Sequence, residues 1–410
     1  MSARRVGARD RTWLRFHTVR AAGPLRVPPA EQVRAVLADL DRVDPGHPLL
    51  CRLVGDRLVR VAPGDLDGFL QTAVTPLEDG PGADDPDELA RRMLAEPLGD
   101  LPFRLVLGRR AAAIRTSHAI GDGGVVDAWF PSLLAAGNPA DLVRADTARW
   151  PLARACLRRF ATHPVRAARA VRGMFPLAPP AGDVHPVEVG TPSVATAVIP
   201  QQRVQAVRAR RDAYAPDVSV ASLVMADTCR ALARHGVRGE GAFVMMGCRR
   251  YLGDDGRVTG NFASGPFLPV DPTDAHRLGA GISAAAADGV PLALLAALTT
   301  RNLLGGTPGD AAPVANDPPR PRITLSYQGR LGLDRLPWED PATARYTIGT
   351  TPSGPQGITL AFVHTPAGLQ VSAGLHPEVL DLDAVQRALD ELATGESTGR
   401  RGSGRAVSRS

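Results

Sequence analysis

Residues 111–124 read Ala-Ala-Ala-Ile-Arg-Thr-Ser-His-Ala-Ile-Gly-Asp-Gly-Gly, an apolar run that ends in a histidine and a glycine-rich turn. The pattern predicts a strand over 111–117 and a helix from about Gly123 to Ala136. His118 therefore stands at the junction, where backbone holds it on both sides while its ring projects from the strand end. With an ordinary pKa near 6.5, an imidazole there can take a proton from a hydroxyl or amine and return it within one turnover.

Asp122 follows His118 by four residues and stands at the predicted helix start. A carboxylate at that position accepts hydrogen bonds from the first amides of the helix and can pair with an arginine, which would fix the loop. Gly121, Gly123 and Gly124 allow a tight turn and close approach of the backbone to a ligand. The plainer alternative is a histidine satisfied within a turn and an ordinary helix cap.

The remaining elements form two α/β halves of similar size. Apolar periodicity predicts helices at 30–42, 201–212, 220–234, 275–303 and 381–393, and strands at 47–54, 58–61, 101–107, 194–199, 242–249, 323–327, 357–364 and 368–375. Residues 141–174 are rich in arginine and predict basic helices that bridge the halves, followed by a linker rich in proline and glycine at 177–192. We therefore expect one subdomain at 13–180, a second at 181–393, and disordered basic tails at 1–12 and 394–410.

The composition excludes several classes of function. All 48 basic residues among the 410 are arginines, so a Walker-A loop, a pyridoxal Schiff base and a protein-kinase site are excluded. The net charge of +6 comes from the two tails, which leaves residues 13–393 close to neutral, and no nucleic-acid partner is expected.

The four cysteines are far apart in sequence and form no CxxC pair, which favours a reduced, cytoplasmic protein. The histidines have no metal-ligand spacing with a third ligand, so no metal site is expected. No uncharged apolar run is long enough to span a bilayer, which leaves peripheral membrane contact open.

The segment Ser117–Gly123 resembles the HHxxxDG signature of the CoA-dependent acyltransferase superfamily, with serine in place of the first histidine. This superfamily includes chloramphenicol acetyltransferase, the condensation domains of peptide synthetases, polyketide-associated acyltransferases and wax ester synthases. Weaker resemblances to its other motifs follow in the family's order, at 46–50, 102–104, 218–223, 247–250 with 260–262, and 325–330. The DFGWG element of the plant enzymes is missing.

The resemblance implies a mixed α/β (α+β) fold of two chloramphenicol-acetyltransferase-like subdomains, arranged as a V-shaped pseudo-dimer around a central channel. It implies that His118 is the general base, which deprotonates an acceptor alcohol or amine for attack on a thioester. The donor would be acyl-CoA or a phosphopantetheinyl thioester on an acyl or peptidyl carrier protein, with no tightly bound cofactor. Asp122 would hold the loop through an arginine, for which Arg249 is our candidate.

Acyl transfer also needs a donor for the anionic tetrahedral intermediate. The candidates are the backbone amides of Gly123 and Gly124 and the hydroxyl of Ser326, which could equally be a plain strand serine. Asn261 follows a glycine and is interpreted as a turn-fixing side chain.

These observations predict a stand-alone acyltransferase or condensation enzyme of specialised-metabolite or lipid biosynthesis. The alternatives are a catalytically silent scaffold that binds carrier proteins, and a cyclase or hydrolase on the same fold. The arginines of 141–174 suit a docking face for an acidic carrier protein or for the phosphates of CoA, or else a solvated linker face.

Overall fold

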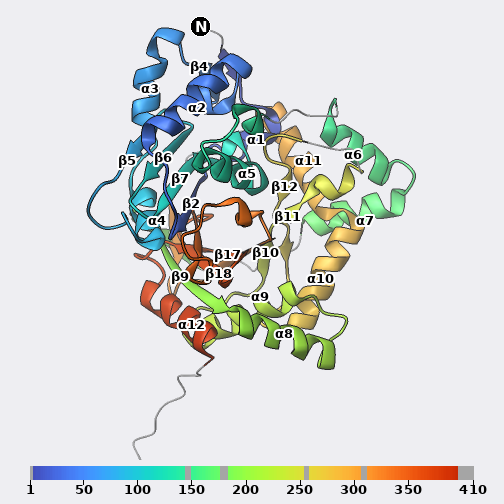
Figure 1. Cartoon of the computed structure of the whole chain (residues 1–410). Coiled ribbons are helices and arrows are strands. Elements are labelled where there is room, and N and C mark those ends of the chain that lie inside the picture. The colour runs from blue at the N-terminus through green and yellow to red at the C-terminus, as the bar shows by residue number, and fades with distance from the viewer. Residues whose placement is uncertain (1–2, 144–148, 176–182, 254–257, 306–311, 396–410) are drawn as a thin grey trace, which may run out of the picture.

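The computed structural model describes residues 3–143, 149–175, 183–253, 258–305 and 312–395. Two large sheets, each covered by helices, lie side by side in the molecule (Figure 1). The predicted α/β class is confirmed.

The first sheet has five strands, in the spatial order β16-β2-β7-β6-β5. The bounds are β2 (His17–Gly23), β5 (Val74–Pro76), β6 (Phe103–Leu107), β7 (Ala112–Ser117) and β16 (Arg345–Thr350). The edge strand β16 comes from the second half of the chain and pairs with β2 in antiparallel fashion. The chain therefore returns from its second half to complete the first sheet.

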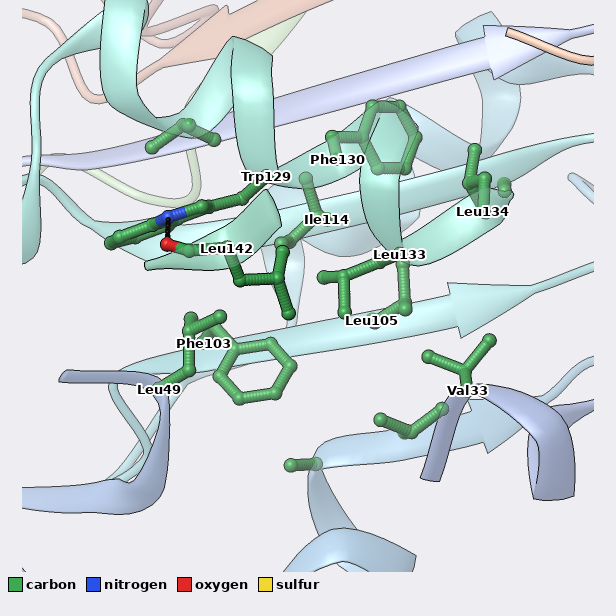
Figure 2. Close-up of a cluster of buried hydrophobic side chains, with 14 of the residues drawn as sticks. Val33, Leu49, Phe103, Leu105, Ile114, Trp129, Phe130, Leu133, Leu134 and Leu142 are labelled. Atoms are coloured by element: carbon green, nitrogen blue, oxygen red, sulfur yellow. Dashed lines mark hydrogen bonds between the residues drawn. The ribbon is translucent and has the colours of Figure 1, made fainter. Parts of the chain in front are cut away.

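One face of this sheet carries the larger N-terminal core. Figure 2 shows Trp129, Phe130, Leu133 and Leu134 of α5 (Gly123–Leu134) above Leu105 and Ile114 of the sheet, with Val33 of α2 (Ala30–Val43) nearby. The indole Nε1 of Trp129 donates to the carbonyl oxygen of Leu142 at 3.0 Å. This packing fixes α5, and with it the loop that precedes α5.

The opposite face of the first sheet packs on α4 (Pro86–Ala95), whose Leu89, Met93 and Leu94 form one buried cluster with Val19 of β2 and Val194 of β9. Helix α4 thus lies between the first sheet and the edge of the second.

The second sheet is mixed and has six strands, in the order β13-β10-β15-β17-β18-β9. Its strands are β9 (Ser193–Pro200), β10 (Ala242–Val244), β13 (Phe267–Leu268), β15 (Arg322–Gly329), β17 (Gly357–Thr365) and β18 (Gly368–Leu375). One face packs on helices, which are α8 (Gln201–Tyr214), α9 (Val220–Arg234), α10 (Ala275–Asp288) and α12 (Leu382–Thr394). From the other face, Ala361 and Val363 of β17 join the N-terminal core, so this face is turned toward the first half.

Two helices, α6 (Pro151–Phe160) and α7 (Pro164–Met174), form a hairpin at the outer edge of the molecule (Figure 1). They pack against α11 (Val290–Leu303) of the second half. The remaining elements are short: β3 (Cys51–Val54), β4 (Arg57–Arg60), α3 (Leu66–Ala73), β8 (Val184–Pro186), β11 (Met246–Gly247), β12 (Ala263–Ser264), β14 (Val314–Asn316) and the 3-10 turns η1 to η7.

Within the stretch expected to be a basic tail at 1–12, residues 3–5 form a strand and residues 8–11 a short helix. Strand β1 (Ala3–Arg5) pairs with β4, and α1 (Ala8–Arg11) contacts α11. The side chain of Asn302 on α11 donates to the carbonyl oxygen of Ala8 and to the hydroxyl of Thr12. Of the expected C-terminal tail, residues 396–410 lie outside the described residues.

Several elements have no counterpart among the sequence-based predictions, and the longer ones are β2, α3, α4 and β16. The predicted strand at 242–249 is divided into β10, β11 and the 3-10 turn η5 (Cys248–Tyr251). In the described part of the chain, no single helix is long and apolar enough to cross a membrane. Helices α10 and α11 reach that length and composition only as a pair that is bent by 60°.

Candidate functional site

His118 lies where β7 ends, as the first residue of the short 3-10 turn η3 (His118–Ile120). Its backbone N–H donates to the carbonyl oxygen of Phe16 at 2.7 Å. Ser117, which replaces the first histidine of the motif, caps the turn by accepting from the N–H of Ala119 at 3.4 Å. The residue before His118 is therefore structural here.

The carbonyl of His118 is held from the second half of the chain. The amide Nδ2 of Asn261 donates to this oxygen at 2.6 Å. Asn261 is itself fixed by Asp10, whose Oδ1 accepts from the backbone N–H of Asn261 at 2.7 Å and from its Nδ2 at 3.2 Å. Asn261 is thus more than a turn residue, because it links the His118 backbone to the N-terminal segment.

The imidazole of His118 stacks on the indole of Trp13, with ring centroids 4.6 Å apart and an angle of 22° between the planes. The side chain is half-buried. Nδ1 is enclosed and has no hydrogen-bond partner on another described residue, while the residue's own backbone acts on the ring as a hydrogen-bond acceptor.

The pKa of His118 is lowered, and the main cause is burial of the ring. The charge of Arg20 lowers it further, whereas the residue's own backbone, Asp122 and Asn261 oppose the shift. Since the pKa lies below its ordinary value near 6.5, the ring is neutral at pH 7 and ready to accept a proton.

Asp122 is buried and paired with Arg249, the partner proposed from the sequence. Nη1 of Arg249 lies 2.5 Å from Oδ2 of Asp122, and Nη2 lies 3.2 Å from Oδ1. The backbone N–H of Phe262 also donates to Oδ2 at 3.1 Å. Asp122 makes no side-chain cap on α5, so its carboxylate turns toward the second half and away from the helix it precedes.

Two glycines of the loop lie where a side chain would be crowded. A Cβ on Gly121 would lie 2.9 Å from two carbon atoms of Val125. One on Gly123 would lie 3.0 Å from Oε1 of Gln328 and 3.1 Å from Nη2 of Arg20. Gly124 is exposed in the first turn of α5, where the positive end of the helix dipole lies.

Ser326 lies on β15, opposite Ala361 of β17 in a parallel register. Residues opposite each other share a face of the sheet, so Ser326 faces the first half, as Ala361 does. Among the described residues it hydrogen-bonds to Gln328, at 3.5 Å, and not to His118 or Asp122. Ser326 thus reaches the motif loop only indirectly, through Gln328 beside Gly123.

A buried ion pair holds the helix that follows the motif loop. Nε of Arg20 donates to Oδ1 of Asp127 at 2.8 Å, and both side chains are almost fully enclosed. The hydroxyl of Tyr346 donates to the same oxygen at 2.7 Å, and burial holds the pKa of that phenol well above 10. Because Asp127 lies on α5 and Tyr346 on β16, this pair ties the helix after the motif to the strand that returns from the second half.

The thiols fit a structural role. Burial raises the pKa of Cys229 and of Cys248 to about 12, and it also raises the pKa of Cys51 and Cys156. A thiol in that state is a poor nucleophile. Over the residues that the structure describes, no group of three metal-ligating side chains occurs.

Sequence reasoning missed the N-terminal contribution to the site. Trp13, Phe16 and Asp10 all contact His118 or Asn261, yet they lie within or beside the stretch interpreted as a tail. The available signal was the aromatic pair Trp13 and Phe16 directly after the arginines, since aromatic residues are only 4% of this chain.

Comparison with known proteins identifies the fold. No family model matches the sequence, and no curated protein matches it. Among solved structures, the chain is similar to the TRI3 trichothecene 15-O-acetyltransferase of Fusarium sporotrichioides, with 11% identity, a TM-score of 0.60, and coverage of 95% of this chain and 94% of that one.

It is also similar to the first condensation domain of the CDA synthetase (16% identity, TM-score 0.57, 96% and 95% covered). A third similar structure is the epimerization domain from the third module of tyrocidine synthetase B (11% identity, TM-score 0.54, 94% and 91% covered). The chain therefore has the fold of acyltransferases and condensation domains over nearly its whole length.

Proposed function

We propose that this protein is an acyltransferase that moves an acyl group from a thioester to an alcohol or amine, with His118 as the general base. The observation that carries the proposal is the way His118 is held. Its N–H, its carbonyl and its ring plane are fixed by Phe16, Asn261 and Trp13. A histidine fixed at three points, with a lowered pKa, suits proton transfer better than a structural role.

The chemical steps balance without a covalent enzyme intermediate. Nε2 takes the proton of the acceptor hydroxyl or amine as its oxygen or nitrogen forms a bond to the thioester carbonyl carbon. The tetrahedral intermediate collapses, the carbon–sulfur bond breaks, and the imidazolium returns its proton to the departing thiolate. The products are the ester or amide and the free thiol.

Donors for the transient oxyanion are available at the start of α5 and on β15. The helix N-terminus at Gly123 offers a backbone amide and a positive dipole end, and Ser326 offers a hydroxyl on the face turned to the first half. The central channel that would bring donor and acceptor together belongs to this proposal.

The donor class is acyl-CoA or an acyl carrier protein, and the acceptor is a small alcohol or amine. Condensation domains and an O-acetyltransferase are among the structural neighbours, which supports a thioester donor and acyl transfer in natural-product biosynthesis. Neither a tightly bound cofactor nor a metal is part of the proposed chemistry.

The test measures thiol release from a panel of acyl-CoA and acyl-pantetheine thioesters, with and without mixed alcohols and amines, followed by mass spectrometry of the products. We expect acceptor-dependent thiol release that is lost in His118→Ala. The matched control is His17→Gln, which alters the neighbouring histidine on β2 and leaves the proposed base in place.

Other results of the same assay would indicate a different activity. Thiol release that does not depend on an acceptor would indicate a hydrolase. Exchange of solvent deuterium into an aminoacyl thioester, without transfer, would indicate epimerization. Full activity in His118→Ala would overturn the proposed mechanism.

A further inference from the structure

The hairpin of α6 and α7 is strongly basic. Residues 149–175 contain no acidic side chain and seven arginines, which are Arg149, Arg154, Arg158, Arg159, Arg166, Arg169 and Arg172. Figure 1 places both helices at the outer edge of the molecule, away from the two sheets. The charge is therefore concentrated on a protruding feature of a nearly neutral body.

The same hairpin exposes large apolar side chains. Trp150 is 75% exposed and Phe175 74%, and they stand directly before α6 and directly after α7. Leu157 is 67% exposed and Val165 65%. Large apolar side chains are usually buried, so their clustering on one hairpin indicates a surface that binds a partner.

Helical spacing puts charge and apolar side chains on the same outward face. On α6, Arg154 and Leu157 are exposed three residues apart, while Ala155 of the opposite face is fully buried. On α7 the exposed set includes Val165, Arg169 and Arg172, and Ala170 faces the body. Each helix therefore presents arginine and aliphatic groups together to solvent.

The hairpin is anchored to the body. Leu152 and Phe160 pack against the cluster that contains Cys248 and Leu252, and Nη1 of Arg158 donates to the carbonyl oxygen of Leu252 at 3.2 Å. The guanidinium of Arg159 lies 5.6 Å from the centre of the Tyr251 ring. The anchoring residues Tyr251 and Leu252 follow Arg249 closely in the sequence. The outward face of the hairpin therefore has a fixed orientation relative to the candidate site.

We propose that the outward face of the α6–α7 hairpin binds the surface of an anionic phospholipid bilayer. Arginine forks match phosphate groups, and exposed tryptophan, phenylalanine, leucine and valine side chains can enter the boundary between headgroups and acyl chains. An acidic protein partner would satisfy the arginines but leaves the four protruding apolar side chains unexplained. The inference is independent of the proposed acyl transfer.

The experiment uses the full chain and vesicles of phosphatidylcholine with 0–40% phosphatidylglycerol, at about 0.1 M salt. Cosedimentation is expected to rise with the anionic fraction and to fall at high salt. Trp150 is the most exposed of the four tryptophans, so its emission is expected to shift to the blue on binding. Trp150→Phe should remove that shift and retain cosedimentation.

Two variants test the two components of the face. The triple variant Arg154→Gln/Arg169→Gln/Arg172→Gln should lower the partition coefficient by roughly fivefold for each arginine. The pair Leu157→Ser/Val165→Ser should weaken binding even at a high anionic fraction. The matched controls are Arg26→Gln/Arg57→Gln/Arg335→Gln for charge and Tyr214→Ser for apolar exposure, since these residues are exposed on other elements.

Three results would overturn the proposal. One is vesicle binding that does not depend on phosphatidylglycerol, and another is equal loss of binding in the hairpin variants and in their controls. The third is binding to poly-glutamate in the absence of vesicle binding, which would assign the face to an acidic protein.

Discussion

Arg249 and Asp122 are separated by 127 residues and meet with Nη1 of the arginine 2.5 Å from Oδ2 of the aspartate. The same guanidinium donates through Nη2 to the carbonyl oxygens of Val258 and Gly260, both at 3.1 Å. One side chain thus joins the motif loop of the first half to the segment that presents Asn261. Since Asn261 holds the His118 carbonyl, the ion pair and that hydrogen bond belong to one connected arrangement.

The first prediction concerns this pair. Arg249→Met leaves the carboxylate of Asp122 buried without its counter-charge, so we expect a loss of about 3 kcal/mol in the free energy of unfolding. The double variant Asp122→Asn/Arg249→Met should lose less free energy of unfolding than the sum of the losses in Asp122→Asn and in Arg249→Met. Urea unfolding of the four proteins measures the coupling, and strictly additive losses would show that the pair is not energetically linked.

The second prediction concerns the pH dependence of turnover. Burial lowers the pKa of His118, so activity should be constant around neutral pH and should fall only at a pH below the ordinary histidine value. Trp13→Ala admits water to one ring face, which should raise that pKa toward 6.5 and move the acid limb of the profile upward. Trp13→Phe keeps an aromatic stack and is the control. Profiles of kcat against pH that coincide for all three proteins would contradict the assignment of His118 as the titrating base.

The third prediction separates positioning from binding. Asn261→Ala removes the donor to the His118 carbonyl, and a small displacement of the base can cost up to roughly 100-fold in rate. We therefore expect kcat to fall by about 10- to 100-fold with little change in KM, together with a loss of stability of about 1–3 kcal/mol because the His118 carbonyl loses its donor. A rise in KM at constant kcat would instead place Asn261 in substrate binding.

The sequence predicts those helices and strands whose local hydrophobic pattern is strong. Helix α9 runs from Val220 to Arg234, as the apolar spacing predicts, and β17 and β18 agree within one residue. Strand β16 was not predicted because its partner β2 lies more than 300 residues away, and nothing local in the sequence of an edge strand encodes such a pairing.

The candidate site also contains residues that the sequence predicts and residues that it does not. His118 and Asp122 stand in one short motif, and Arg249 follows from the resemblance, so the sequence predicts this part. Trp13 and Asp10 contribute through contacts across the fold that arise only after packing. Arginine-rich composition made 1–12 resemble a tail, although Arg9 donates to the carbonyl oxygen of Thr259 at 2.7 Å and lies over the Phe262 ring.

The fourth prediction concerns acid stability. His47 is 3% exposed, and burial lowers its pKa to about 4. A histidine whose folded pKa is lowered contributes stability above its unfolded pKa near 6.5, and that contribution is lost as pH falls from 6.5 toward 4. The shift corresponds to about 3 kcal/mol at the acid end. His47→Gln should therefore flatten the fall of the thermal midpoint between pH 6.5 and 4.5, whereas an unchanged slope would refute this role.

The last prediction returns to the N-terminal segment. Asp10 accepts from the backbone N–H and the side chain of Asn261, so Asp10→Ala leaves these donors without their acceptor at a cost of about 1–3 kcal/mol. Because Asn261 in turn orients the His118 carbonyl, we expect Asp10→Ala to lower kcat as well as stability. Asp10→Asn retains an Oδ1 acceptor and should recover most of the rate, even though it removes the charge paired with Arg9. Loss of stability with an unchanged kcat in Asp10→Ala would mean that α1 supports the fold alone and does not act on the base.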